Sequence, residues 1–193
     1  MGGTVTNSGF ARCRSFRTVW DHAYPTPVPG AAGPGAGGTT VTATSEPLVV
    51  ECHVAAPPEH AFEVWTTHIA TWWPQSHTIS GDPASVTVAP EVGGRVVETT
   101  HDGTTYDWGE VAAWEPPTRL GLRLRLFIDR DETSSVDVRF LADDAGTRVR
   151  LEQTGLDRLG PPGTPRRARV GAAWASITTH FVAACEAGWA AQT

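Results

Sequence analysis

Residues 95–115 read RVVETTHDGTTYDWGEVAAWE and contain the clearest hairpin pattern of the chain. Asp102-Gly103 separates two β-rich segments, and an Asp-Gly pair in this position is a strong signal for a two-residue hairpin turn. Counting outward from that turn pairs residue 99 with 106, 97 with 108 and 95 with 110. The count sets Arg95 opposite Glu110. The residues it predicts to share one face of the hairpin are Val97, Thr99, Tyr106 and Trp108.

Alternating patterns extend this hairpin into a sheet. Residues 48–54, LVVECHV, form a β-rich segment upstream. Downstream, apolar residues recur at every second position, with arginines and other polar residues between many of them; the apolar ones are Leu120, Leu122, Leu124, Leu126, Ile128, Val136, Val138, Phe140, Val149 and Leu151. A period of two predicts strands with one polar and one apolar face. We therefore expect an antiparallel sheet whose apolar face needs a cover.

Helical spacing predicts that cover. Pro57 and Pro58 suit a first helical turn, and Trp72-Trp73-Pro74 closes the same region as a short helical turn or loop. Thr164-Pro165 predicts the start of a long amphipathic helix. The apolar positions of the two helical regions are Phe62, Trp65 and Ile69, then Val170, Trp174, Ile177, Phe181 and Cys185. The order of short helices, antiparallel strands and a long last helix predicts an α+β fold.

Composition excludes several classes of function. The chain has 193 residues, of which 40% are hydrophobic and 19% charged, and no apolar run long enough to span a membrane. All fifteen basic residues are arginines, which excludes a lysine Schiff base and the phosphate-binding P-loop. The formal net charge of -6 argues against nucleic acid as a partner. Three scattered cysteines fit a reducing cytoplasm better than a disulfide framework.

The amino-terminal quarter of the chain differs from the rest. Residues 25–47 read PTPVPGAAGPGAGGTTVTATSEP and have no hydrophobic period. Such a composition buries too little apolar surface to offset the entropy of ordering the chain. We expect residues 1–46 to be a disordered tail and linker and residues 47–193 to form one domain.

Several motifs in that domain resemble one family. They are the stretch from Val54 to Glu59 that leads to Phe62 and Trp65, the pair Trp72-Trp73, Val92-Gly93-Gly94-Arg95, Trp108-Gly109-Glu110-Val111, Trp114 to Leu120, Gly146-Thr147-Arg148-Val149, and Trp174. In this order over about 140 residues, they resemble the START-like (SRPBCC) superfamily, in the branch of the heat-shock-protein ATPase activator homologues. The resemblance implies a helix-grip fold, with two short N-terminal helices and one long C-terminal helix across the concave face of a curved antiparallel sheet.

The resemblance also implies a hydrophobic cavity between the last helix and the sheet, but fold alone does not choose a function. The first hypothesis is a non-catalytic protein that binds a small hydrophobic or aromatic molecule in this cavity. A second is an enzyme resembling polyketide cyclases or aromatases, with acid and base residues in the cavity. A third is a protein-interaction module resembling the chaperone activator. A protein partner or a homodimer remains open, and no cofactor is expected.

The candidate ligand-binding residues are mostly aromatic, since large rigid rings suit apolar ligands. They are Trp72, Trp73, Tyr106, Trp108, Trp174 and Phe181, with His77 as a possible lining residue. Arg95 and Glu110 join them as a polar anchor or tuned acid if their shared face is the inner one; otherwise they form an exposed cross-strand pair.

Catalytic and metal sites are not expected. The seven histidines show no metal-binding spacing, and no nucleophile elbow is present. Cys52 and Cys185 lie on apolar stripes, where inert buried thiols are expected. No catalytic residue is therefore assigned.

Overall fold

The structure is a computed structural model that describes residues 46–125, 133–156 and 166–191. The expected tail, apart from Glu46, lies outside these residues, as do Leu126, Ile128 and the predicted helix start at Thr164-Pro165. Seven strands form one antiparallel sheet in the order β1-β7-β6-β5-β4-β3-β2. The strands are β1 (Leu48–Val54), β2 (Pro83–Val88), β3 (Arg95–Thr100), β4 (Thr105–Glu115), β5 (Arg119–Leu124), β6 (Ser134–Asp143) and β7 (Gly146–Thr154).

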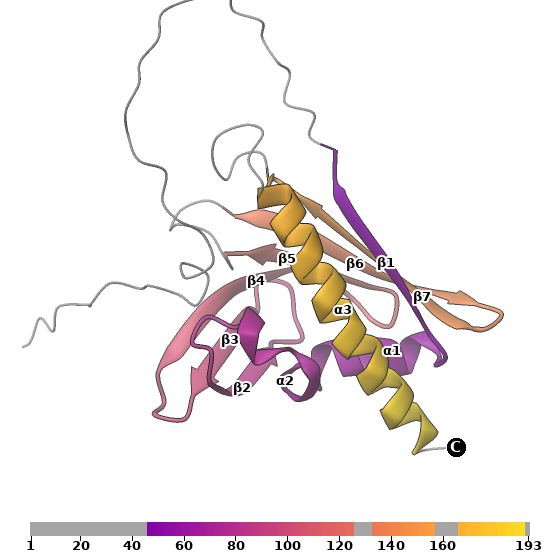
Figure 1. Ribbon diagram of the computed structural model, residues 1–193, viewed down its shortest axis with the longest axis horizontal. Coiled ribbons are helices and arrows are strands. Elements are labelled where there is room, and N and C mark those ends of the chain that lie inside the picture. The colour runs from indigo at the N-terminus through magenta and orange to yellow at the C-terminus, as the bar shows by residue number, and fades with distance from the viewer. Residues whose placement is uncertain (1–45, 126–132, 157–165, 192–193) are drawn as a thin grey trace, which may run out of the picture. The chain divides into compact units, whose positions relative to one another are not determined.

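Helices cover one face of this sheet (Figure 1). They are α1 (Pro58–Thr66), α2 (Ile69–Trp72), the 3-10 turn η2 (Gln75–His77) and the long α3 (Arg166–Ala190). The predicted α+β helix-grip fold is confirmed, including the two short helices, which lie between β1 and β2, and the long helix across the sheet. The alternation along the strands explains why one face is covered. Leu120, Val138 and Leu151 are fully buried beneath the helices. The arginines of the same strands, Arg123, Arg139 and Arg150, point to the other face and are more exposed.

The hairpin of β3 and β4 departs from the predicted register near its turn. The connection is a three-residue loop, residues 101–103, because Thr100 donates its N–H to the Thr104 carbonyl and Gly103 has a φ of +85°. This loop pairs Glu98 with Tyr106 and Val97 with Asp107. The predicted pairs 97–108 and 99–106 are therefore wrong by one residue.

A bulge in β4 restores the predicted register farther from the turn. Trp108 is the extra residue, since Val97 pairs with Asp107 while Val96 already pairs with Gly109. Gly109 has a φ of +144°, a conformation that suits glycine alone. Arg95 then lies opposite Glu110, as predicted.

The bulge and the loop together decide which side chains of β3 enter the core. Val96 and Glu98 are buried at 1% and 0% exposure beside Trp108, whereas Val97 and Thr99 are paired with exposed residues of β4. The predicted shared face of Val97, Thr99, Tyr106 and Trp108 is thus wrong for β3. Tyr106 and Trp108 lie instead on the face of Val96 and Glu98. A carboxylate, Glu98, takes a core position instead.

Candidate functional site

Five tryptophans and a phenylalanine meet between the sheet and the helices. Trp73 follows α2 and is 8% exposed. Its ring centroid lies 5.0 Å from that of Trp108 in β4, 5.8 Å from that of Trp174 in α3 and 5.6 Å from that of Trp72. Trp65 and Phe181 stack behind Trp72. The structure therefore brings together the predicted aromatic residues Trp72, Trp73, Trp108, Trp174 and Phe181.

Trp108 and Trp174, the two tryptophans on either side of Trp73, are each fixed by a buried polar side chain. Trp108 donates its Nε1–H to Glu98 Oε2 at 2.8 Å. Trp174 donates its Nε1–H to Gln153 Oε1 at 2.6 Å, and Gln153 in turn donates to the Ser134 hydroxyl at 2.8 Å. Buried N–H groups rarely go unpaired, so these bonds set the orientation of both rings. We call Trp108 and Trp174 the wall tryptophans.

Trp73 is held differently, by the short segment that carries it. Its Nε1–H donates to the carbonyl of His77 at 3.0 Å. Further hydrogen bonds stay inside this segment, from the His77 N–H to the Pro74 carbonyl and from the Thr78 N–H to the Gln75 carbonyl. We call residues 73–80 the Trp73 segment. Its internal bonding ties the indole to the segment rather than to the sheet or to α3.

Glu98 is the functional candidate that sequence reasoning missed. Its side chain is fully buried, and its two oxygens accept three N–H groups. Oε2 accepts from the Ile79 backbone at 2.8 Å and from Trp108, and Oε1 accepts from the Ser80 backbone at 2.9 Å. Three donors satisfy a buried carboxylate that would otherwise be costly. The register predicted from the turn put Glu98 on the face of the hairpin opposite Trp108, so the sequence pattern did not indicate that it is buried.

The expected cavity is nearly filled by these rings. The enclosed space left between the helices and the sheet has a volume of about 10 Å³, room for about one water molecule. Its lining is entirely apolar: Trp65, Ile69, Trp73, Val88, Val96, Trp108, Leu120, Leu122, Leu124, Val136 and Trp174. The prediction of a ligand-sized hydrophobic cavity between the last helix and the sheet is therefore wrong for the described residues. The physical reason is that large side chains from the helices and the sheet, the Trp73 indole among them, fill this space.

The predicted polar candidates lie mostly outside this interior. Arg95 pairs with Asp107, and Glu110 accepts from Arg123 at 2.7 Å on the outer face of the sheet. Arg95 and Glu110 thus lie opposite each other outside the interior, but each forms its ion pair with another residue, so they are neither an interior anchor nor an ion pair with each other. The buried carboxylate beside Trp108 is that of Glu98. Tyr106 shares the face of Glu98 by register but lies near the strand end and is half-buried.

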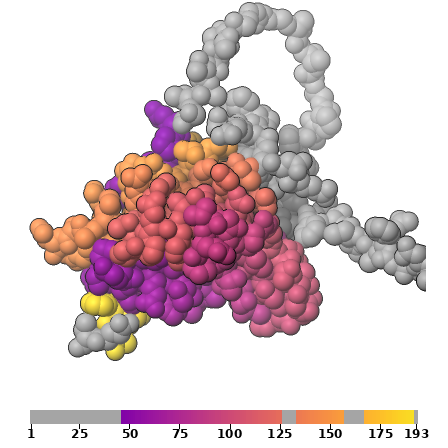
Figure 2. All heavy atoms as spheres, turned by 180° about the vertical axis from the view of Figure 1, so that it is seen from behind, coloured from indigo at the N-terminus to yellow at the C-terminus, as the bar shows by residue number. Residues whose placement is uncertain are grey.

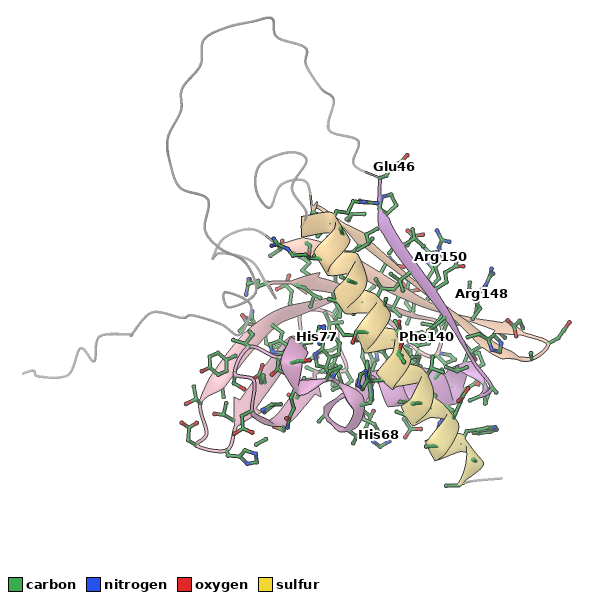
Figure 3. The ribbon with its side chains drawn as sticks, in the orientation of Figure 1. Glu46, His68, His77, Phe140, Arg148 and Arg150 are labelled. Atoms are coloured by element: carbon green, nitrogen blue, oxygen red, sulfur yellow. The ribbon has the colours of Figure 1, made fainter. Side chains whose placement is uncertain are left out.

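The outer face of the sheet is covered by ion pairs. Figure 2 views this side of the molecule, and in Figure 3 Arg148 and Arg150 project from β7 away from α3. Arg150 pairs with Glu51 at 2.8 Å, and Arg119 pairs with Asp137 at 2.7 Å. An open hollow of about 170 Å³ lies here at Gly121, where a side chain is absent. Its charged lining residues, Arg119, Asp137 and Glu152, already have ion-pair partners.

His77 lies at the end of η2 in the Trp73 segment (Figure 3). Partial burial, and then the charge of His180 on α3, hold the pKa of His77 below its usual 6.5. The unfolded chain therefore takes up this proton first as the pH falls. The stability that His77 contributes is fully present above pH 6.5 and is lost as the pH falls through the lower folded-state pKa.

This shift predicts a pH-dependent difference between the protein and its His77→Gln variant. Between about pH 7.5 and about pH 5, the wild-type melting temperature should fall further than that of the variant, since glutamine does not titrate. Thermal unfolding followed by circular dichroism at each pH measures both. Parallel curves over the whole range would contradict the prediction.

The cysteines in the described residues are unreactive in character. Burial raises the pKa of Cys185 to about 12 and that of Cys52 to about 11, so neither is a thiolate at neutral pH. Cys185 is fully buried and Cys52 is half-buried on β1. The expectation of inert thiols agrees with these values. In the same residues no three His, Cys, Asp or Glu side chains are grouped so that they could hold a metal ion.

Comparison with known proteins places the chain among similar folds. Residues 55–186 match the family model described as activator of Hsp90 ATPase homolog 1-like protein. A solution structure of an AHSA1-like protein from Aeromonas hydrophila is 26% identical, with a TM-score of 0.51 over 69% of this chain and 88% of that chain. A crystal structure from Rhodobacter sphaeroides is 21% identical, with a TM-score of 0.57 over 79% and 97%.

A third solved structure is that of an anthrahydroquino-gamma-pyrone synthase. It is 34% identical over 70% of this chain and 86% of that chain, with a TM-score of 0.47. No curated protein matches the chain. Among the helices of the described segments, none is long and apolar enough to cross a membrane.

Proposed function

Because the chain belongs to the family of activator of Hsp90 ATPase homolog 1-like proteins, whose helix-grip fold is adapted to several functions, we propose that it binds a flat aromatic molecule without transforming it. The ligand occupies the place that the Trp73 indole fills here, and the Trp73 segment moves outward to admit it. The wall tryptophans then contact the ligand with tilted and edge-on rings, as they now contact Trp73.

The observation that carries this proposal is the position of Trp73 between two rings that are fixed by other elements. Glu98 of β3 orients Trp108, and Gln153 of β7 orients Trp174. The Trp73 N–H, in contrast, is bonded within its own segment. If the segment moves away, the two wall rings keep their partners and the space of the Trp73 indole becomes free. Offset and edge-on aromatic contacts favour a planar ligand in such a slot.

Energetics restricts the size of the ligand. An aromatic side chain buries roughly 150–250 Å² of surface, and its exposure to water costs about 25 cal/mol for each Å². A ligand must bury at least a comparable apolar area to offset the exposure of Trp73. Two fused rings match the indole in area, whereas a single ring buries less. The lining of the remaining space contributes apolar contacts alone.

The enzyme alternative has less support. Its candidate acid and base residues are Glu110, Arg95, Tyr106 or a histidine, and of these Arg95 and Glu110 lie on the outer face in ion pairs. Within the described residues, every fully buried side-chain nitrogen and oxygen has a hydrogen-bond partner. Among these residues no fully buried acid or base is therefore left unpaired in the interior.

The interaction-module alternative lacks an apolar docking surface in the described part of the chain. The large hydrophobic residues that are exposed there are Val49 at 39% and Val92 at 67%, which lie on different elements. Single exposed apolar residues are ordinary in soluble proteins, and a docking surface needs a contiguous patch. A filled interior agrees with a module that binds through its surface. The binding experiment below therefore decides between ligand binding and the interaction module.

Calorimetric titration of the full chain with 2-naphthol tests the proposal, since this probe has two fused rings. We expect saturable binding to one site, and clearly weaker binding of phenol, because a single ring does not replace the indole area. Tryptophan fluorescence should change in the same titration. Absence of saturable binding up to the solubility limit of 2-naphthol would assign the tryptophans to the structural core and favour the interaction module.

A further inference from the structure

Glu98 connects the two parts of the site that must separate when a ligand enters. One of its oxygens, Oε2, holds the wall tryptophan Trp108 and the Ile79 N–H together. The other oxygen, Oε1, accepts the N–H of Ser80. Ile79 and Ser80 form the far end of the Trp73 segment, while the near end is fixed through Trp72, whose Nε1–H donates to the Val64 carbonyl at 2.7 Å. Glu98 is thus the side-chain attachment of the far end, which continues into β2 at Pro83, and its release would free the segment there.

Opening at this end changes the hydrogen bonding of the carboxylate. When Ile79 and Ser80 move away with the segment, Glu98 loses two of its three donors and keeps that of Trp108. The side chain is fully buried in the closed form, in the interior of the sheet's concave face. A buried carboxylate with vacant acceptor sites is expensive, and a donor that replaces the lost ones is correspondingly favourable.

The ligand is the group best placed to supply that donor. In the place of the Trp73 indole it lies against Trp108, whose Nε1–H donates to Glu98 Oε2. A ligand that extends along the Trp108 ring toward this N–H brings its edge next to the carboxylate. A hydroxyl or ring N–H at that edge can donate to the oxygens that Ile79 and Ser80 vacate. Hydrogen bonds to charged acceptors are stronger than those between neutral groups.

We infer that Glu98 is a specificity-determining residue that selects flat aromatic molecules carrying a hydroxyl or N–H donor over bare aromatic hydrocarbons and ethers. This inference rests on the proposed function, because it requires that a ligand displaces the Trp73 segment. Without ligand, the Glu98 carboxylate accepts the backbone N–H groups of Ile79 and Ser80. With ligand, it accepts a hydrogen bond from the hydroxyl or N–H of the ligand instead.

Affinities for a matched pair of probes test the inference. 2-Naphthol and 2-methoxynaphthalene share one ring system, and the second lacks the donor. We expect the full chain to bind 2-naphthol at least about tenfold more tightly, the effect of one charge-assisted hydrogen bond. In Glu98→Gln the ratio of the two affinities should fall to within about twofold to threefold, because the charged acceptor is gone. Glu110→Gln, on the outer face, should keep the wild-type ratio.

The outcomes separate the inference from the proposed function. If both probes bind and the ratio is the same in Glu98→Gln as in the wild type, Glu98 does not receive the donor and the inference is overturned while the proposed function stands. If neither probe binds the wild type, the proposed function fails and the inference fails with it.

A measurement on the wild type alone covers the case in which Glu98→Gln does not fold. Amide hydrogen exchange, followed by NMR, reports on the Ile79 and Ser80 N–H groups that Glu98 holds. We expect exchange at both amides to accelerate at least about tenfold when 2-naphthol saturates the site, while the amide of Val138, in the middle of the sheet, keeps its rate. Unchanged protection of Ile79 and Ser80 in the complex would overturn the inference.

Discussion

Trp73→Ala is expected to destabilise the protein by about 3–5 kcal/mol and to create a site that indole refills. The truncation removes the ring that lies between Trp108 and Trp174, and the wall rings cannot collapse onto each other while Glu98 and Gln153 hold them. Urea unfolding with and without millimolar indole measures both effects. Indole at about a hundred times its dissociation constant should restore about 2.7 kcal/mol.

Trp189→Ala is the matched control for this experiment. Trp189 lies near the carboxyl end of α3, where its ring stacks on His60 with centroids 5.4 Å apart, and it does not line the interior space. Its truncation should cost less, because it is half-buried rather than enclosed. Indole should not stabilise this variant beyond its effect on the wild type. Equal responses to indole in both variants would show that the Trp73 position is not a binding slot.

Gly109→Ala is expected to have the second large effect, through the bulge that places Trp108 and Glu98 inside. A Cβ at this position would lie 2.0 Å from the Arg123 carbonyl oxygen on β5, a clash with backbone that no side-chain rotation relieves. The φ of +144° adds strain for any residue with a side chain. We expect a loss of more than about 3 kcal/mol in urea unfolding, together with a changed tryptophan fluorescence spectrum.

Gly103→Ala separates the effect of the clash from that of backbone strain. Gly103 also has a positive φ, +85°, but a Cβ there would have no atom within 4 Å. Its substitution should cost only the strain, about 1 kcal/mol, and leave the fluorescence of Trp108 unchanged. If Gly109→Ala were no more destabilising than Gly103→Ala, the bulge would not control the position of Trp108 and Glu98.

The architecture was predictable from the sequence because alternation and helical spacing act over many residues. The strand pattern around Leu120 and the spacing of Trp174 and Phe181 each tolerate local irregularities. The register of β3 could not be predicted from these patterns. A three-residue loop and a one-residue bulge cancel each other at Arg95 and Glu110, so the predicted pairing is right at that end of the hairpin. Closer to the turn the pairing is shifted, and Val96 and Glu98 face the core. Only the backbone conformations of Gly103 and Gly109 reveal this.

The filled interior was beyond sequence reasoning for a different reason. Patterns indicate which side chains face inward, but not whether their volumes fill the space between helix and sheet. The structure brings the aromatic candidates together, and their side chains, the Trp73 indole among them, leave a space of only about 10 Å³. The predicted register placed Glu98 on the face opposite Trp108, whereas the structure buries it beside that ring and leaves Arg95 and Glu110 in ion pairs on the outer face.

If a ligand replaces the Trp73 indole beside the wall tryptophans, the new contacts are visible in the full chain saturated with 2-naphthol. Intermolecular nuclear Overhauser effects measure them. We expect contacts from the probe to the ring protons of both Trp108 and Trp174, with loss of the contacts between Trp73 and Trp108. Retention of the Trp73–Trp108 contacts in the saturated complex, with no probe contact to either wall ring, would contradict this replacement.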